Sequence, residues 1–273
     1  MGCLGTPSMG SFILAEVLIT DENKDEEIQI INSHENLVRE NEVQPEESQK
    51  NEEEIKKCEI KINDNIIPFT YKYKFPNKGK YKICYTFDIS TRADFLFYNC
   101  SAHVNIDFSR FNTKPITNMK GMFCSCKAVE KIDVSSFITE NVTDFSDMFC
   151  SCEALKTIDV SKLNTKKATD MGSMFSSCTK LTELDLSNFD TENVISMEMM
   201  FQACQSLKTL NLSSFKTPNL QYATFMFQGC KSLTYLNISN FSMGKLDSTL
   251  DYYLFNNTPS LEKKTLLLKN KTS

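Results

Sequence analysis

The chain repeats itself every 26 residues. Period, phase and residue type agree across six units, which chance does not produce. A repeat of this length predicts units that cannot bury an apolar face alone and that stack on one another. The period is marked by Phe97, Phe123, Phe149, Phe175, Phe201 and Phe227, and by Cys100, Cys126, Cys152, Cys178, Cys204 and Cys230.

Each unit has two parts with different apolar spacing. In the unit 181–204, Leu184 and Leu186 alternate with polar residues, which is typical of a strand with one buried face. Val194, Met197, Phe201 and Cys204 then step by three and four, which indicates one face of a helix. The predicted fold class is therefore an α/β solenoid. It is a right-handed leucine-rich-repeat stack with a parallel sheet on its concave face and short helices on its convex face.

The rest of the chain divides around this repeat. Residues 1–57 are acid-rich, so we expect a disordered acidic tail. Residues 58–90 alternate between turn signals, which predicts a three-stranded β-meander that caps the N-terminal end. The six repeats occupy residues 91–243. Residues 244–273 resemble a degenerate capping repeat, in which the spacing slips to 28 between Leu233 and Leu261.

Composition excludes several classes of function. A net charge of -5 gives no electrostatic reason to bind nucleic acid. The two histidines, His34 and His103, form no recognisable catalytic constellation, and no phosphate-binding loop occurs. We therefore expect neither an enzyme nor a cofactor. Ser11–Thr20 is apolar but short, interrupted by Glu16 and without a basic flank, which argues against a signal peptide or membrane span.

The first residues fit an acylation motif. Met1-Gly2-Cys3-Leu4-Gly5-Thr6 matches the template for myristoylation of Gly2, and palmitoylation of Cys3 could follow. The opposing interpretation is an ordinary chain start, because no polybasic patch supports an anchor. Membrane association is expected only if these residues are acylated.

The strand positions of the repeat are the candidate binding surface. Alternation places a column of aspartates on the exposed face, where stacked carboxylates would repel one another unless a basic partner or a cation were bound. The alternative is that these side chains only accept local hydrogen bonds. Residues that vary from unit to unit lie beside the column. The candidate surface comprises Asp107, Lys131, Asp133, Thr157, Asp159, Glu183, Asp185, Thr209, Asn211, Tyr235 and Asn237.

The cysteines could indicate a metal site or disulfides, but their spacing also fits core positions of the repeat. Cys126 and Cys152 belong to the regular column and are expected in the core. Most cysteines of the chain are expected to be reduced thiols. Cys124 and Cys126 are two residues apart, so on a helix they would not converge on one metal ion. No metal site is predicted. A disulfide between Cys124 and Cys150 of adjacent units is an alternative in an oxidising compartment.

With these columns assigned, the repeats resemble the BspA-like leucine-rich repeat family. Asn141-Val142, Met148-Phe149 and Cys152 match its unit, as do Leu184-Asp185-Leu186-Ser187, Phe189 and Thr191. The resemblance covers the repeats and implies a leucine-rich-repeat fold and a binding role without catalytic residues. Surface members of that family carry a secretion signal, which we do not find.

Two functions from different classes follow. The first is a cytoplasmic, monomeric, non-enzymatic module that binds a protein through the exposed strand face. The sequence does not identify this partner, and the aspartate column would suit a basic one. The second is a BspA-like cell-surface or adhesion protein, tethered by acylation or exported without a signal peptide.

Overall fold

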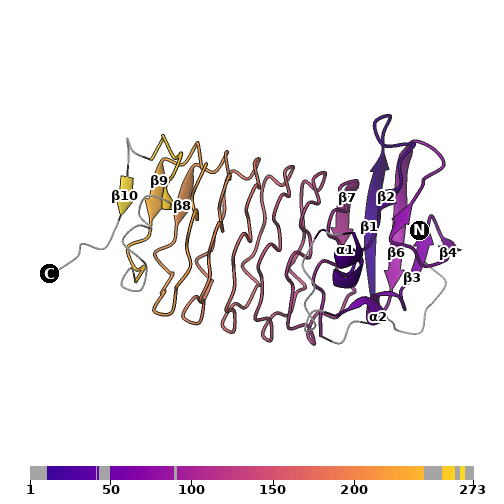
Figure 1. Ribbon diagram of the computed structural model, residues 1–273, viewed down its shortest axis with the longest axis horizontal. Coiled ribbons are helices and arrows are strands. Elements are labelled where there is room, and N and C mark those ends of the chain that lie inside the picture. The colour runs from indigo at the N-terminus through magenta and orange to yellow at the C-terminus, as the bar shows by residue number, and fades with distance from the viewer. Residues whose placement is uncertain are drawn as a thin grey trace.

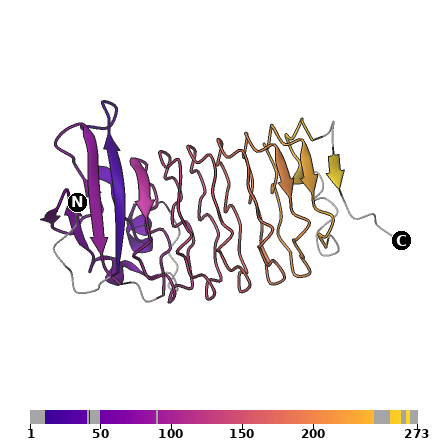
Figure 2. The ribbon, with the colours of Figure 1, turned by 180° about the vertical axis from the view of Figure 1, so that it is seen from behind.

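The computed structural model of the chain describes residues 11–40, 42, 50–88, 91–242, 254–261 and 265–267 (Figure 1). A β-sheet near the N-terminus is followed by a row of similar coils that runs toward the C-terminus (Figures 1 and 2). The core continues from the sheet into the coils, because Ile13 and Tyr85 of the sheet belong to the same buried cluster as Phe123 and Phe201 of the repeats.

The sheet at the N-terminal end has five strands, and all of its pairs are antiparallel. In spatial order they are β4 (Asn65–Ile67), β3 (Glu59–Ile62), β6 (Gly79–Thr86), β1 (Phe12–Ile19) and β7 (His103–Asp107). A smaller antiparallel pair joins β2 (Ile28–Gln29) to β5 (Lys72–Tyr73). Two short helices, α1 (His34–Arg39) and α2 (Glu52–Ile55), lie beside the sheet (Figure 1).

The prediction of a disordered tail over residues 1–57 is wrong for the described part of that segment. Strand β1 alternates strictly, and its inward side chains Ile13, Ala15, Val17 and Ile19 are at most 3% exposed. Burial of this row provides the apolar area that offsets the entropy of ordering the segment. The charged side chain of Glu16 lies on the opposite face, so it does not interrupt the strand.

The predicted β-meander over residues 58–90 is also wrong in its topology. Strand β3 pairs with both β4 and β6, so the first strand of this segment lies in the middle, where a meander would place the second. The run 66–75 divides between β4 and β5, and β5 pairs with β2 instead of with the main sheet. Strand β1 pairs with the other edge of β6 and lies between β6 and β7.

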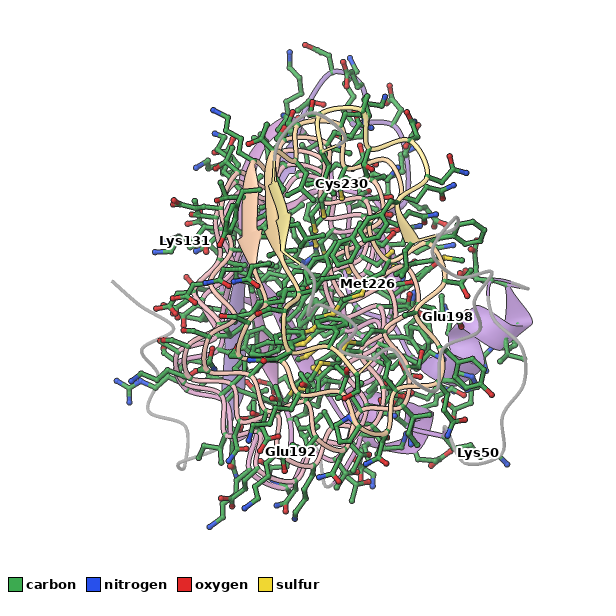
Figure 3. The ribbon with its side chains drawn as sticks, turned by 90° about the vertical axis from the view of Figure 1, so that its left-hand side faces the viewer. Lys50, Lys131, Glu192, Glu198, Met226 and Cys230 are labelled. Atoms are coloured by element: carbon green, nitrogen blue, oxygen red, sulfur yellow. The ribbon has the colours of Figure 1, made fainter. Side chains whose placement is uncertain are left out.

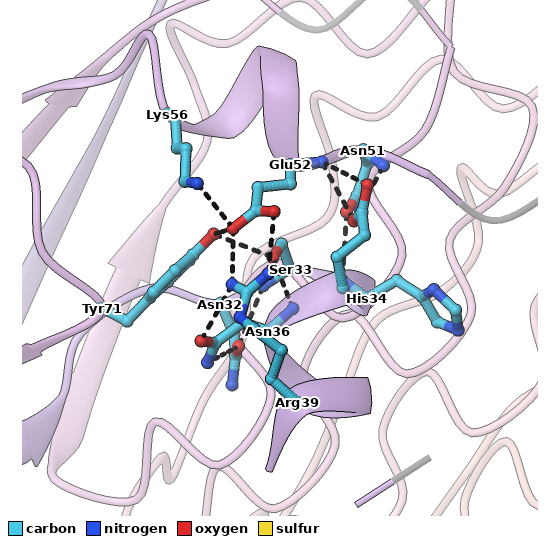
Figure 4. A network of polar contacts seen from close by, with 10 residues as sticks. Asn32, Ser33, His34, Asn36, Arg39, Asn51, Glu52, Lys56 and Tyr71 are labelled. Atoms are coloured by element: carbon cyan, nitrogen blue, oxygen red, sulfur yellow. Dashed lines mark hydrogen bonds and ion pairs between the residues drawn. The ribbon is translucent and has the colours of Figure 1, made fainter. Parts of the chain in front are cut away.

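A polar network ties the elements before the repeats together (Figure 4). Arg39 of α1 donates hydrogen bonds to both carboxylate oxygens of Glu52 of α2, and the Tyr71 hydroxyl donates to Glu52 at 2.7 Å. The hydrogen bond from Arg39 lowers the pKa of Glu52 to about 2. The side chain of Asn51 donates to the carbonyl of Asp94 at 2.8 Å, which joins this network to the first coil.

The predicted α/β leucine-rich-repeat solenoid is contradicted by the structure. Most residues in described strands belong to the antiparallel sheet, and no α-helix occurs between residues 91 and 242. Parallel pairing of strands is confined to β8 (Thr209–Asn211), β9 (Tyr235–Asn237) and β10 (Thr265–Leu267) among the described strands. The segments predicted as convex-face helices are successive turns.

Hydrogen bonds between coils explain why no helix forms. In the unit 119–126, alternate N–H groups donate to the next coil: Gly121 to the carbonyl of Ser146 and Ser125 to that of Cys150, both at 2.8 Å. The same pattern recurs in the following units. Two residues per unit hold a positive φ, as Ser125 (62°) and Gly121 (57°) do, and each such residue ends any right-handed helical run.

Stacked rings fill the centre of the coils. The rings of Phe123 and Phe149 lie 5.7 Å apart and nearly parallel, at 4°, and those of Phe175 and Phe201 lie 6.0 Å apart at 1°. The stack continues through Phe227 to Phe255, beyond the last regular unit, at 5.7 Å. Residues 244–253 of the predicted C-terminal capping repeat lie outside the described residues.

The regular cysteine and threonine columns also bond between coils. The thiol of Cys152 donates to the carbonyl of Phe123 at 3.2 Å, and its counterparts in other units do the same. The hydroxyl of Thr165 donates to the carbonyl of Asp190 at 2.9 Å and accepts from its N–H at 2.8 Å. Both columns are buried, and each of these side chains places its polar group against a backbone group of another coil.

The threonine column should contribute measurably to stability. We expect Thr165→Val to lower the free energy of unfolding by roughly 1–3 kcal/mol, because both backbone groups of Asp190 lose their partner. Thr182→Val is the matched control, since Thr182 is exposed and its hydroxyl makes a single bond of 3.4 Å. Urea denaturation of both variants measures the difference, and equal losses would contradict the role assigned to the column.

Acid sensitivity should arise in part from His103, which is fully buried and lies 3.2 Å from the Tyr85 hydroxyl. Burial lowers the pKa of His103 to about 3. The unfolded chain therefore takes up a proton at His103 near pH 6.5, and stability falls between that pH and about pH 3. We expect His103→Leu to reduce the stability lost between pH 7.5 and pH 4.5 by on the order of 2–3 kcal/mol. Denaturation curves at the two pH values test this; an unchanged difference would contradict it.

Candidate functional site

A shallow groove of about 760 Å³ crosses four consecutive coils of the repeat. Every predicted surface residue from position 131 to position 211 lines it. In Figure 3, which looks along the row of coils, Lys131 points outward from the side of the molecule that carries β8 and β9, whereas Cys230 lies inside. The predicted residues that line the groove are Lys131, Asp133, Thr157, Asp159, Glu183, Asp185, Thr209 and Asn211. We call this surface the aspartate face.

The remaining predicted residues lie at the two ends of the aspartate face. Tyr235 and Asn237 of β9 pair in register with Thr209 and Asn211 of β8, and both are half-buried. At the other end, Asp107 of β7 forms a parallel bridge with Asp133. The predicted positions therefore form one continuous surface, although the groove itself spans only its central part.

The aspartates close local turns. One carboxylate oxygen of Asp159 accepts the backbone N–H of Ser161 at 2.9 Å, and Asp185 accepts that of Ser187 at the same distance. Asn211 accepts the N–H of Ser213 at 3.1 Å in the same way. These side chains therefore accept the local hydrogen bonds that the alternative interpretation predicted. Either an aspartate or an asparagine provides the required oxygen.

The same hydrogen bonds keep the aspartates charged. The N–H of Ser161 and then its hydroxyl lower the pKa of Asp159, and Ser187 acts equally on Asp185. The hydroxyl of Ser135 lowers the pKa of Asp133. Since these carboxylates are exposed to solvent, the aspartate face presents a row of fixed negative charges at neutral pH.

Charge on the aspartate face is unbalanced. Four carboxylates, from Asp133, Asp159, Asp185 and Glu183, line the groove against the one lysine, Lys131. The groove has two rows of polar residues: one contains Lys131 and Glu183, the other the aspartates. Between them lies a narrow apolar floor, in which Leu184 is half-buried and Ile158 is 9% exposed. This arrangement can attract cationic groups and accept a little apolar area beneath them.

A second hollow, of about 530 Å³, lies on the N-terminal sheet, where the sequence predicted no site. Leu14 and Glu16 of β1 line it together with Lys82 and Cys84 of β6. It adjoins the aspartate face, because Asp107 lines this hollow and pairs with Leu14 on one side and Asp133 on the other. Alternation within residues 12–19 was the available signal, but the acidic stretch that follows concealed it.

The cysteines, the histidines and the acylation motif are not among the residues of the aspartate face. The regular cysteines are buried, and no group of three or more His, Cys, Asp or Glu side chains suited to a metal occurs among the described residues. His34 and His103 are both buried and belong to different elements, α1 and β7. Gly2 and Cys3 lie outside the described residues. Among those residues no helix is long and apolar enough to cross a membrane.

Comparison with known proteins gives one result for the repeats. No curated protein matches the chain. A family model described as "Mycoplasma protein of unknown function, DUF285" matches twice, over residues 91–184 and 152–266. The two overlapping matches together cover well over half of the chain and contain the whole aspartate face. The chain therefore belongs to this DUF285 family.

Proposed function

We propose that the protein is a non-enzymatic binding module whose aspartate face holds a basic segment of a partner protein. The observation that carries the proposal is the row of exposed carboxylates in the groove, whose ionised form is further stabilised by backbone and hydroxyl donors. Fixed charges in a shallow, extended groove suit a partner that brings several cationic side chains along its length.

The chemistry of the groove favours lysine or arginine side chains. Both carry a long apolar stem below the charged group, and the stem can cover Leu184 and Ile158 while the charge reaches the carboxylates. Each exposed ion pair contributes roughly 0–1 kcal/mol, so affinity arises from several pairs together and falls as salt is added. Nucleic acid, which is itself polyanionic, remains the least suitable partner on the same grounds.

The alternative function, a BspA-like cell-surface or adhesion protein, differs in location and not in the surface used. It rests on the resemblance of the repeats and on Gly2 and Cys3, which lie outside the described residues. A cytoplasmic location, a monomeric state and the absence of a catalytic activity all remain predictions.

The proposal is tested by variants that remove the negative charge of the aspartates but keep the hydrogen bonds that close the turns. Because Asn211 and Asn237 already make the same hydrogen bond, Asp→Asn changes at this column should preserve the fold. We expect the triple variant Asp133→Asn, Asp159→Asn and Asp185→Asn to bind a short lysine-rich peptide about tenfold more weakly than the parent protein in low salt. Fluorescence anisotropy of the labelled peptide measures the change.

The control variant loses the same charge elsewhere. Glu140→Gln, Glu192→Gln and Glu198→Gln lie outside the groove lining, and Figure 3 shows Glu192 and Glu198 away from Lys131. This triple variant should bind the peptide as the parent does. Equal weakening by both triple variants would mean that overall charge and not the aspartate face binds the peptide, and no weakening by the first would also refute the proposal.

A further inference from the structure

Two cysteines of the repeats, Cys124 and Cys150, lie outside the regular cysteine column and occupy equivalent positions in adjacent coils. Cys124 and Cys150 are 26 residues apart and belong to one column of the repeat. Gln202 donates to Gln228 in this column at 2.6 Å. The thiols of Cys124 and Cys150 are near enough for each to shift the pKa of the other. The full column is Tyr98, Cys124, Cys150, Ser176, Gln202 and Gln228.

The backbones of the two cysteines match closely. Each N–H donates to the carbonyl three residues earlier, Cys124 to Gly121 and Cys150 to Asp147, both at 3.0 Å. The N–H of Ser125 donates to the carbonyl of Cys150 at 2.8 Å, which places the two residues side by side. Backbone segments joined by hydrogen bonds of this kind lie about 4.8 Å apart. This distance is inside the range of Cα separations that disulfides span.

We propose that Cys124 and Cys150 are a disulfide-forming pair, which a small-molecule disulfide such as glutathione disulfide oxidises to a covalent link between adjacent coils.

Access and ionisation favour Cys150 as the attacking thiol. Cys150 is half-buried, whereas Cys124 is 9% exposed. The interaction between the two thiols lowers the pKa of Cys150, and the same interaction together with burial raises the pKa of Cys124. The thiolate is the reactive form of cysteine, so the first exchange occurs at Cys150.

The reaction is then two successive exchanges. The Cys150 thiolate attacks one sulfur of glutathione disulfide, which forms a mixed disulfide and expels one glutathione thiolate. Cys124 loses its proton and attacks the Cys150 sulfur, so that the bond between Cys124 and Cys150 forms and the second glutathione leaves. The two thiol protons end on two glutathione molecules, and the two electrons lost by the protein reduce glutathione disulfide.

The chain contains its own control pair. Cys126 and Cys152 lie in the same two coils at the same spacing, but both are fully buried. Their thiols donate to the carbonyls of Phe97 and Phe123 at 3.2 Å, and burial raises the pKa of each thiol well above its ordinary value. The two pairs have the same spacing in sequence but differ in exposure to solvent. Comparing them therefore shows whether oxidation is specific to Cys124 and Cys150 or follows from the stacking of coils alone.

The experiment titrates the folded full-length protein with glutathione disulfide, alkylates the remaining thiols and maps the peptides by mass spectrometry. We expect a Cys124–Cys150 link, a loss of two hydrogen atoms, while Cys126 and Cys152 are recovered as thiols. The Cys124→Ser variant should stop at the glutathione mixed disulfide on Cys150, and Cys152→Ser should leave the link unchanged. Dithiothreitol should reverse it.

Three results would overturn the proposal. The first is a Cys126–Cys152 link at the same or lower oxidant concentration, and the second is a mixed disulfide on Cys150 that never resolves in the parent protein. The third is full recovery of both thiols at oxidant concentrations that form disulfides in the urea-unfolded chain.

Discussion

The hydrogen bonds between consecutive coils are the interaction on which the rest of the structure depends. Each coil donates alternate N–H groups to the carbonyls of the next coil, so equivalent residues are held in line along the molecule. The phenylalanine rings stack because their backbones are aligned in this way. The buried cysteine and threonine side chains then bond to carbonyls of neighbouring coils that the main ladder leaves available.

The same constraint organises the exposed face. One aspartate or asparagine per coil closes a turn with the serine two residues later, and the stacking of coils turns this local motif into a row of charges. Structure and proposed function are linked here, because the donors that stabilise each turn also lower the pKa of the carboxylates that would meet a partner. The strand β7 extends the row to the N-terminal sheet through Asp107.

Period and alternation were sufficient to place the aspartate face. Leu186 is buried and Asp185 exposed, as period-two spacing requires, and the 26-residue period brings Asp133, Asp159 and Asp185 into the same groove. The predicted helices failed because the spacing of Val194, Met197, Phe201 and Cys204 also fits a series of turns. In this unit the residues that break the helix are Met199 and Ala203, with φ near 55°, and neither is a residue type that signals a turn. The role of β1 was concealed because its pairing with residues 79–86 depends on contacts distant in sequence.

The central claim is that residues of the repeat bond to the next coil and not within a helix. NMR couplings across hydrogen bonds test this directly at Ser151. The account predicts a coupling from the Ser151 amide nitrogen to the carbonyl carbon of Ser176, which accepts its hydrogen at 2.7 Å. A coupling to the carbonyl of Asp147, the partner four residues earlier in an α-helix, would contradict the account.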